Sequence, residues 1–324
     1  MEVIKYNKNK HQSQSRVVVL VTMVWLALST SCIALAETQR IAVLYPDISP
    51  PYRDVFLDII KGIEDVAKDS VKIFDIKKDF DEKLLRHDLE EAQIDVVIAL
   101  GNRGLNAARK LPNVFDVVVG AVFLTPDNKS DVSAGISLNP DPEILFRQLK
   151  ELAPRVRRVS VVYNPEHSGW LIERAEKAAK QSALSLNAMP ARNLKEAAAL
   201  YRDLIRDADS SQAFWLLQDS SILDQRVILA MILKKAWDKQ FVVFSGNPGH
   251  VRKGALFSLY PDNIGMGRSL GSIAINRFQT DKRKDETVPV RDLLIAVNTR
   301  TAKRMNLKFI NAIRREFDLV FPTK

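Results

Sequence analysis

Cysteine is nearly absent from this sequence, since Cys32 is the only one in 324 residues. If the chain is cleaved after Ala36, as the N-terminal pattern described below predicts, no cysteine is left. Such a chain forms no disulfide, has no thiol nucleophile and binds no metal through a thiolate. A chain of this length buries a large core, so it can be stable outside the cell without disulfides.

Catalytic and metal-binding patterns are scarce as well. The four histidines, at positions 11, 87, 167 and 250, do not form H-E-x-x-H or another metal-ligand spacing. The segment Gly101-Asn102-Arg103-Gly104 matches neither a G-x-G-x-x-G fingerprint nor a phosphate-binding loop, which needs a Lys-Ser/Thr pair after its last glycine. We therefore expect a protein that is not an enzyme and that has no metal site and no cofactor.

A basic stripe with interleaved aromatic residues is also lacking. The formal charge is +9, but acidic residues accompany the basic ones in the helical patterns, and the densest charged run, 281–286, is mixed in sign. We therefore expect no nucleic-acid partner. The hydrophobic fraction of 46% indicates a soluble globular protein, and the length suggests about two domains.

The N-terminal segment has the three parts of a secretory signal peptide. Basic residues at positions 5, 8, 10 and 16 precede an apolar run, 17–28, and Ala34-Leu35-Ala36 is an A-x-A cleavage signal. We predict that residues 1–36 are removed and that the mature protein is periplasmic. Because this segment carries four basic residues and one acidic residue, its removal lowers the net charge from +9 to +6.

Two alternatives to a cleaved signal peptide stay open. One is an uncleaved membrane anchor. The other is lipid attachment at Cys32, although Ser29-Thr30-Ser31-Cys32 lacks the leucine that a bacterial lipobox has three positions before its cysteine.

Short apolar runs alternate with helical patterns through the rest of the chain. Each run ends in small, polar or turn-forming residues, as buried strands do. The predicted strands of a first set are 40–45, 71–76, 95–100, 116–123 and 134–138, and those of a second set are 159–163, 185–188, 213–217, 241–244 and 254–260. Because helical patterns alternate with these runs, the sequence predicts an α/β fold with parallel sheets in two Rossmann-like units.

The predicted helices and the end of the chain complete this pattern. The helices are 56–66, 82–92, 142–152, 172–183, 194–207, 222–237 and 263–278. The prolines of Asn139-Pro140-Asp141-Pro142 indicate a linker between the two sets of strands. A strand at 290–297 and a short helix at 299–305 are expected to cross back between the two units.

Several segments carry a family resemblance. They are Ala134-Gly135-Ile136-Ser137, Leu149-Lys150-Glu151-Leu152-Ala153-Pro154, Val161-Val162-Tyr163-Asn164-Pro165, Leu217-Gln218-Asp219, Gly254-Ala255-Leu256-Phe257-Ser258 with Pro261-Asp262, and Val297-Asn298-Thr299-Arg300-Thr301-Ala302. From about Arg40 to Phe309 the chain resembles the periplasmic substrate-binding proteins of ABC transporters, in the branch that includes tryptophan and tyrosine binders. It departs from the family near the expected cleft, at Phe115-Asp116, Leu124-Thr125-Pro126-Asp127 and Lys129-Ser130-Asp131.

The resemblance implies a type I periplasmic-binding fold, in which two Rossmann-like lobes joined by a three-crossover hinge close on a ligand. It places 37–137 with about 262–290 in lobe I, and 138–261 with about 291–324 in lobe II. It also implies a small-molecule ligand and a membrane ABC permease as partners, and we expect a monomer. A sensory module, which passes ligand occupancy to a signalling partner, is the alternative.

The candidate ligand-binding residues follow the predicted strands, because ligands of open α/β sheets bind beyond the carboxyl ends of the strands. In lobe I they are Tyr45, Ser49, Tyr52, Gly101, Asn102 and Phe123. Gly101 and Asn102 begin a helix, whose free N–H groups favour an anion, and Phe123 can stack on an aromatic ligand. The alternatives are a stiff surface loop for the first three residues, a tight turn at Gly101 and a core position for Phe123.

The candidates in lobe II are Tyr163, Asn164, Trp170, Gln218, Asp219, Ser220, Ser245 and Gly246. Trp170 is predicted to lie in a polar loop. The carboxylate of Asp219 can pair with a ligand ammonium group, and Ser220 can add a hydrogen bond. The alternative is that Asp219 caps a helix that begins near Ser221. With an anion near Gly101 and a cation near Asp219, an amino-acid-like zwitterion is the simplest ligand.

Overall fold

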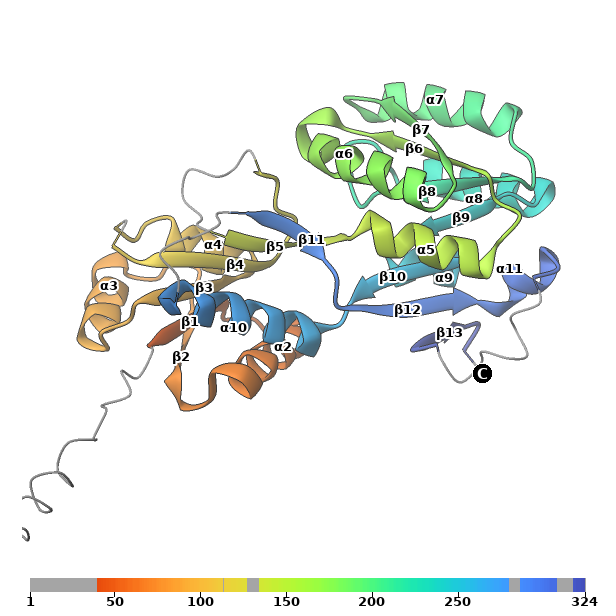
Figure 1. Cartoon of the computed structure of the whole chain (residues 1–324). Helices are drawn as coiled ribbons and strands as arrows, with labels where there is room; N and C mark the ends of the chain where they lie inside the picture. Colours follow the sequence, from red (N-terminus) through yellow and green to blue (C-terminus); the bar gives the residue numbers. More distant parts are fainter. Residues whose placement is uncertain (1–39, 113, 127–133, 280–285, 308–316, 324) are drawn as a thin grey trace, which may run out of the picture. The chain divides into compact units, whose positions relative to one another are not determined.

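A computed structural model describes residues 40–112, 114–126, 134–279, 286–307 and 317–323 (Figure 1). The predicted signal peptide, 1–36, and with it Cys32 lie outside these residues, so cleavage and lipid attachment stay predictions. Within the described ranges, no helix combines the length and the apolar character that a membrane span requires.

The first sheet is built from the apolar runs of the first half of the chain. Among the described residues it has six strands in the order β11-β5-β4-β3-β1-β2. Their bounds are β1 (Ile41–Pro46), β2 (Val71–Ile76), β3 (Val96–Leu100), β4 (Asp116–Val122), β5 (Ala134–Pro140) and β11 (Thr287–Val290). The recorded pairings are all parallel, and β1 and β3 are buried along their whole length, as central strands of a covered parallel sheet are.

Helices cover both faces of the first sheet. They are α2 (Tyr52–Ala67), followed by the 3₁₀ turn η1 (Lys68–Ser70), α3 (Glu82–Glu91), α4 (Gly101–Ala108) and α10 (Asn263–Gln279). The helices α2 and α10 share one apolar cluster with β1 and β3, and α3 and α4 share the cluster on the other face. The close approach of α2 and α10 requires glycine, since an added Cβ at Gly267 would lie 2.1 Å from the carbonyl oxygen of Ile59. At Gly62 it would lie 2.1 Å from the carbonyl oxygen of Ile264.

The second sheet has seven strands among the described residues, in the order β13-β12-β10-β9-β8-β6-β7. Their bounds are β6 (Arg158–Tyr163), β7 (Ser185–Pro190), β8 (Gln212–Leu216), β9 (Val242–Ser245), β10 (Phe257–Pro261), β12 (Leu293–Asn298) and β13 (Leu319–Phe321). Neighbouring strands in the described part are parallel, except that β12 runs antiparallel to β10. The carboxyl end of β12 therefore lies at the edge where the parallel strands begin.

The second sheet is also covered on both faces. Its helices are α5 (Pro142–Leu152), α6 (Pro165–Gln181), α7 (Leu194–Arg206), α8 (Ile228–Lys239), α9 (Pro248–Lys253) and α11 (Thr299–Arg304). The clusters place α5 and α6 on one face and α7 and α8 on the other. Under α5, Phe146 packs edge-on against Trp215 with ring centroids 5.5 Å apart, and Phe244 stacks on Phe257 at 5.2 Å. Such contacts add to the stabilisation from burial.

The chain passes between the two sheets three times, from β5 to α5, from β10 to α10 and from β11 to β12 (Figure 1). This topology confirms the predicted α/β fold class with a three-crossover connection. The strand predicted at 290–297 is in fact two strands in different sheets. Arg291 and Asp292 lie between them and form one of the crossings.

Three predicted helices begin at other residues. The helix expected at 56–66 begins at Tyr52. The helix expected from Ile222 begins at Ile228, because the Asp224 side chain accepts hydrogen bonds from the N–H groups of Arg226 and Val227 and holds a turn instead. The helix expected from 172 begins at Pro165. Trp170 therefore lies within α6, and its predicted position in a polar loop was wrong.

Candidate functional site

Polar side chains join the loops at the carboxyl end of the second sheet. Asn164, directly after β6, caps α6 by accepting a hydrogen bond from the Glu166 N–H at 3.1 Å. Its amide donates to the Ser221 hydroxyl oxygen at 3.1 Å. The Nδ1 atom of His167 lies 2.8 Å from Oδ2 of Asp219, in the loop after β8. Two side-chain contacts thus tie the loop after β6 to the loop after β8.

Asp219 is held as an ionised carboxylate at this edge. Its other oxygen, Oδ1, accepts a hydrogen bond from the Ser221 N–H at 2.8 Å. Burial favours the neutral acid, but the hydrogen bonds from Ser221 and His167 outweigh it and lower the pKa of Asp219 below its ordinary value. The carboxylate therefore caps a turn rather than the predicted helix, which begins at Ile228. Its neighbour Ser220 is exposed.

The loop after β9 completes the edge. The Gln218 side chain donates to the carbonyl oxygen of Gly246 at 2.9 Å. Ser245 is fully buried, and its hydroxyl lies 3.1 Å from Nδ1 of His250. Burial, with a smaller effect of the Lys253 charge, lowers the pKa of His250 to about 4. Neutral His250 and Ser245 thus form an internal contact beneath Gly246.

The candidates that follow β1 do not gather in the same way. Tyr45 is buried in the apolar cluster under α2 and α10. Ser49 and Tyr52 are exposed, and 73% of the Tyr52 surface is accessible. Among the described residues, no hydrogen bond is recorded for the side chains of these three residues, so nothing in that range fixes them toward one point.

Gly101 and Asn102 begin α4, as predicted from the sequence. Gly101 has a φ of 68°, and an added Cβ would lie 3.0 Å from the Phe56 ring, so glycine is needed both for its backbone and for its lack of a side chain. Asn102 is exposed and lines a surface cavity of about 740 Å³ together with Phe56 and Arg103. This cavity contains none of the other predicted ligand residues.

A cavity of about 520 Å³, here called the Phe123 cavity, brings together three candidates, Phe123, Gln218 and Gly246. Phe123 is 48% exposed and follows β4, where Ala121 has a positive φ of 59° and the pairing with β5 shifts register. Residues 260–264, which include one of the crossings, line the same cavity. Apolar side chains and a few polar groups converge here, as in many ligand sites.

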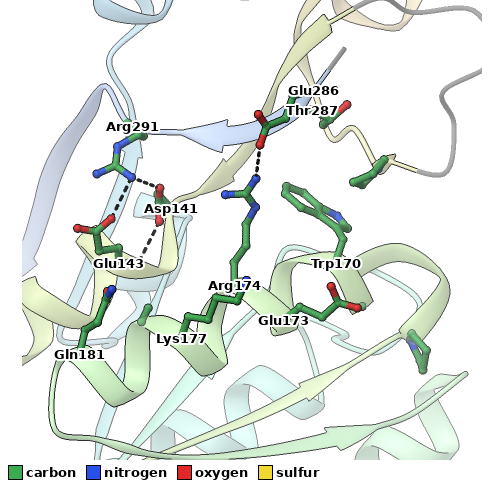
Figure 2. Close-up of a pocket in the computed structure, with 14 residues that line it drawn as sticks. Asp141, Glu143, Trp170, Glu173, Arg174, Lys177, Gln181, Glu286, Thr287 and Arg291 are labelled. Atoms are coloured by element: carbon green, nitrogen blue, oxygen red, sulfur yellow. Dashed lines mark hydrogen bonds and ion pairs between the residues drawn. The ribbon is translucent and has the colours of Figure 1, made fainter. Parts of the chain in front are cut away.

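A larger cavity of about 860 Å³ contains Trp170 (Figure 2). Its lining is rich in charge, and the charged residues are Asp141, Glu143, Glu173, Arg174, Lys177, Glu286 and Arg291. The guanidinium of Arg174 in α6 donates a hydrogen bond to the carboxylate of Glu286 at 2.9 Å, and Glu286 lies directly before β11. The indole nitrogen of Trp170 is buried and has no hydrogen-bond partner among the described residues. Tyr163, the candidate at the end of β6, is half-buried against the core of the second sheet.

The charged lining of this cavity was not predicted from the sequence. Residues 170, 173, 174, 177 and 181 of α6 face the cavity at helical spacing, and this periodicity is the signal that could have revealed them (Figure 2). The ion pair of Arg174 with Glu286 joins residues more than one hundred positions apart, which no local pattern shows.

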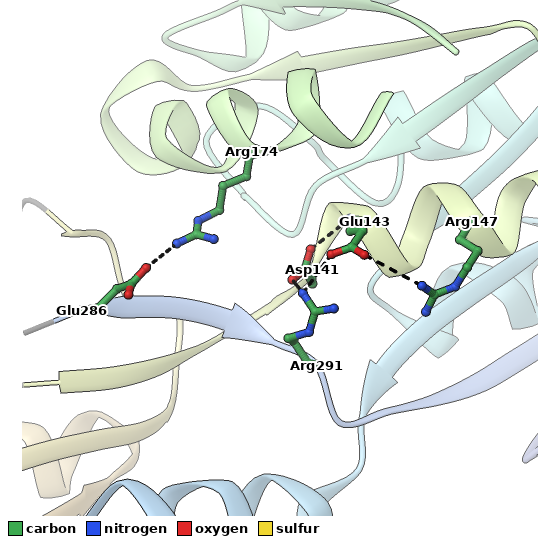
Figure 3. A network of polar contacts seen from close by, with 6 residues as sticks. All are labelled: Asp141, Glu143, Arg147, Arg174, Glu286 and Arg291. Carbon is green, nitrogen blue, oxygen red and sulfur yellow. Dashed lines mark hydrogen bonds and ion pairs between the residues drawn. The ribbon is translucent and has the colours of Figure 1, made fainter. Parts of the chain in front are cut away.

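Arg291 connects two of the three crossings (Figure 3). Its guanidinium forms an ion pair with Asp141, the N-cap residue of α5. It also donates a hydrogen bond to the carboxylate of Glu143 at 3.1 Å. Glu143 in turn lies 3.9 Å from Arg147. Burial disfavours the charged guanidinium, but these carboxylates outweigh it and raise the pKa of Arg291. The chain segments at both crossings are therefore held by the same arginine.

One sequence in the chain matches the G-x-S-x-G pattern of serine hydrolases, at 267–271. It lies inside α10 rather than at a turn from strand to helix, and Ser269 donates to Asp292 at 2.6 Å. A nucleophile elbow needs that turn, so this segment is a packing helix and not a catalytic one.

In the described ranges, no three His, Asp or Glu side chains gather in a way that could hold a metal ion.

The described residues thus form two β-sheets covered by helices, with polar loops and cavities near the crossings.

A family model described as ABC transporter substrate binding protein matches residues 59–318 of the chain. The chain belongs to this family. ABC substrate-binding proteins bind small molecules, work with an ABC transporter and are not enzymes, and the family is typically extracytoplasmic. A search of curated protein sequences finds no match.

Solved structures of substrate-binding proteins share the fold. A structure described as an ABC domain in complex with L-Trp, from Streptococcus pneumonia, is 18% identical and covers 87% of this chain and 99% of its own, with a TM-score of 0.51. A ligand-free, open substrate-binding protein with adhesive properties, from Clostridium difficile, is 16% identical, covers 88% of this chain and 100% of its own, and has a TM-score of 0.60. At these identities the likeness shows the fold, and the ligand residues of this ABC substrate-binding protein stay a prediction.

Proposed function

We propose that this protein captures a small amino-acid-like zwitterion beyond the carboxyl ends of its two sheets and delivers it to an ABC permease. The observation that carries the proposal is the ionised Asp219, fixed at the edge of the second sheet by Ser221 and His167. A carboxylate held in this way is ready to receive an ammonium group without reorganisation.

The neighbouring groups fit the other parts of such a ligand. The half-exposed ring of Phe123 offers an apolar face across the cavity that Gln218 and Gly246 also line. The start of α4, at Gly101 and Asn102, has no side-chain cap among the described residues, and the N–H groups of a helix start suit a carboxylate. The complex of the Streptococcus pneumonia structure with L-Trp supports an aromatic amino acid as the first ligand to test.

The proposal includes the location and state of the protein. Cleavage after Ala36 would release a periplasmic monomer, and lobes of 37–137 with about 262–290, and of 138–261 with about 291–324, would close on the ligand. The extracytoplasmic character of the family supports this location.

The test is thermal unfolding of the protein with single amino acids, nucleosides, sugars and short peptides. A ligand at a hundredfold excess over its Kd adds about 2.7 kcal/mol and shifts the midpoint upward by several degrees. We expect the shift with an amino acid and a much smaller one for Asp219→Ala. A shift with sugars or nucleosides alone, or an equal shift for Asp219→Ala, contradicts the proposed ligand. A ligand-bound protein that stimulates no permease would favour the sensory role.

A further inference from the structure

A second pocket lies at the edge of the second sheet opposite the polar loops. It is formed where α8 and α9 end and where β12 leads into α11, and these points all lie at the amino ends of the parallel strands. Figure 1 shows α9, α11 and β13 next to the end of β12, and α9 and α11 both contact β13. A ligand bound here would not reach Asp219 or the Phe123 cavity.

This pocket, here called the Trp237 pocket, has a volume of about 340 Å³. Three cations line it, Arg252, Lys253 and Arg300, and no carboxylate is among its described lining residues. The Lys253 ammonium donates to the neutral amide of Gln225 at 2.8 Å. Within the part of the chain that the structure describes, no ion pair is recorded for any of the three cations. All three are exposed, so their charge is accessible to an anion from outside.

The Trp237 ring lies close to the guanidinium groups of two arginines. The guanidinium of Arg300 lies 5.5 Å from the centre of its ring, and that of Arg304 lies at 5.6 Å. Trp237 itself is 37% exposed. An arginine that stacks on an aromatic face keeps its N–H edge free, and this edge matches two oxygens of a phosphate group. Stacking also restricts the guanidinium before any ligand arrives.

The floor of the pocket is held by hydrogen bonds between distant segments. The buried Asn298 amide donates to the Val251 carbonyl oxygen at 2.8 Å, and Thr301 donates to the Gly254 carbonyl oxygen at 3.0 Å. Thr299 donates to the carbonyl oxygen of Phe321 at 3.1 Å. The cations thus project from a fixed frame and not from free loops.

Helix ends account for only part of this charge. Arg252 and Lys253 lie in the last turn of α9, and Arg304 lies in the last turn of α11, where a cation complements the helix dipole. Arg300 lies in the first turn of α11, where a cation gains nothing from the dipole, and it has no carboxylate partner among the described residues. The partner recorded for its guanidinium is the Trp237 ring.

We propose that the Trp237 pocket is a second binding site, for a molecule with a phosphate group. Arg252, Lys253 and Arg300 hold the phosphate oxygens, and the exposed part of Trp237 covers the group that the phosphate is attached to. A soluble phosphoester and a phospholipid headgroup share this chemistry. The site is separate from the proposed amino-acid site, so it stands or fails independently of it.

The test measures the two sources in parallel on the chain without its predicted signal peptide, residues 37–324. Inorganic phosphate and glycerol phosphate are titrated while tryptophan emission is recorded, and sedimentation is measured with vesicles of phosphatidylcholine with and without phosphatidylglycerol. We expect a saturable emission change that is lost in Trp237→Phe, which locates the ligand. Arg300→Gln should weaken binding by about tenfold or more, because a charge-assisted hydrogen bond is removed.

The matched control is Arg202→Gln, an exposed arginine of α7 whose replacement changes the net charge equally. Binding of the soluble phosphates identifies a free anion as the ligand, and binding only to phosphatidylglycerol vesicles identifies a headgroup. Arg252→Gln is the second variant if Arg300→Gln unfolds at a lower temperature. The proposal is overturned if neither probe binds, if Arg202→Gln weakens binding as much as the pocket variants, or if Trp237→Phe keeps the emission change.

Discussion

The carboxyl edges of the two sheets differ in how their side chains are held. At the second sheet, hydrogen bonds join the loops after β6, β8 and β9 through Asn164, Asp219 and Gln218. At the first sheet, Tyr45 is in the core, Tyr52 is exposed, and Phe123 follows a strand with an unusual backbone at Ala121. Polar contacts thus fix the side chains at the carboxyl edge of the second sheet. At the first sheet, packing and backbone conformation position them. Specificity for polar groups of a ligand should come mainly from the second sheet.

The largest effect is expected where α2 packs closely on α10. Gly267→Ala would place a Cβ 2.1 Å from the Ile59 carbonyl oxygen, so α2 and α10 must separate. Overpacking of this kind should lower the free energy of unfolding by about 3 kcal/mol. The control is Gly169→Ala in α6, where a Cβ meets nothing within 4 Å. Alanine there should stabilise by about 0.5–1 kcal/mol. Urea denaturation of both variants checks the contrast, and equal effects would contradict it.

The next effect concerns the buried histidine at the second edge. The pKa of His250 is lowered to about 4, while the unfolded chain binds the proton near its ordinary value of 6.5. Between these values the unfolded state holds more protons, so the free energy of unfolding falls as the pH falls, by up to about 3 kcal/mol. His250→Gln should remove this part of the pH dependence. His87→Gln, at an exposed position of α3, should not.

Denaturation curves at a series of pH values between about 7 and 4 measure this difference. The decisive quantity is the slope of the free energy of unfolding against pH. The slope of each variant is subtracted from that of the wild type. An unchanged slope in His250→Gln would mean that the pKa of His250 is not lowered in the folded protein.

The third effect compares carboxylates at the two edges. Asp219→Ala removes the acceptor for Ser221 and His167, and it should lower the free energy of unfolding by about 1–2 kcal/mol near neutral pH. Because the pKa of Asp219 is lowered in the folded state, this loss should shrink as the pH falls below about 4. The control is Asp47→Ala, an exposed position after β1. A similar loss in both variants would show that the edges do not differ.

Much of this architecture could be predicted from the sequence because it rests on local signals. Buried parallel strands are continuous apolar runs, so β1, β3, β4, β8 and β9 were found nearly at their true bounds. The start of α6 at Pro165 was missed although Asn164 and Pro165 form a cap and first turn, since Trp170 and the polar residues around it hid the helical period. The crossing predicted at 139–142 was also readable, because Pro140 ends β5 and Pro142 begins α5.

The partners of the site residues could not be predicted in the same way. The contact of His167 with Asp219 and that of Arg174 with Glu286 join α6 to distant segments, whose positions are set only by the sheet order. Tyr45 shows the opposite problem, because the last residue of a strand can face the core or the ligand edge, and periodicity does not decide between them. Residue type therefore indicated which residues lie at the carboxyl edge of a sheet. The direction of each side chain could be known only from the folded structure.

The smallest effect tests whether backbone conformation positions Phe123 at the first edge. Ala121 has a φ of 59°, which costs an L-residue about 1–2 kcal/mol and costs glycine little. Glycine adds entropy to the unfolded chain, so Ala121→Gly should stabilise by only about 0.5 kcal/mol. The counterpart is Gly101→Ala, at a φ of 68° beside the Phe56 ring, which should destabilise by more than Ala121→Gly stabilises. Paired denaturation curves measure both. If Ala121→Gly destabilises instead, β4 is unstrained at Ala121, and backbone strain does not distinguish the first edge from the second.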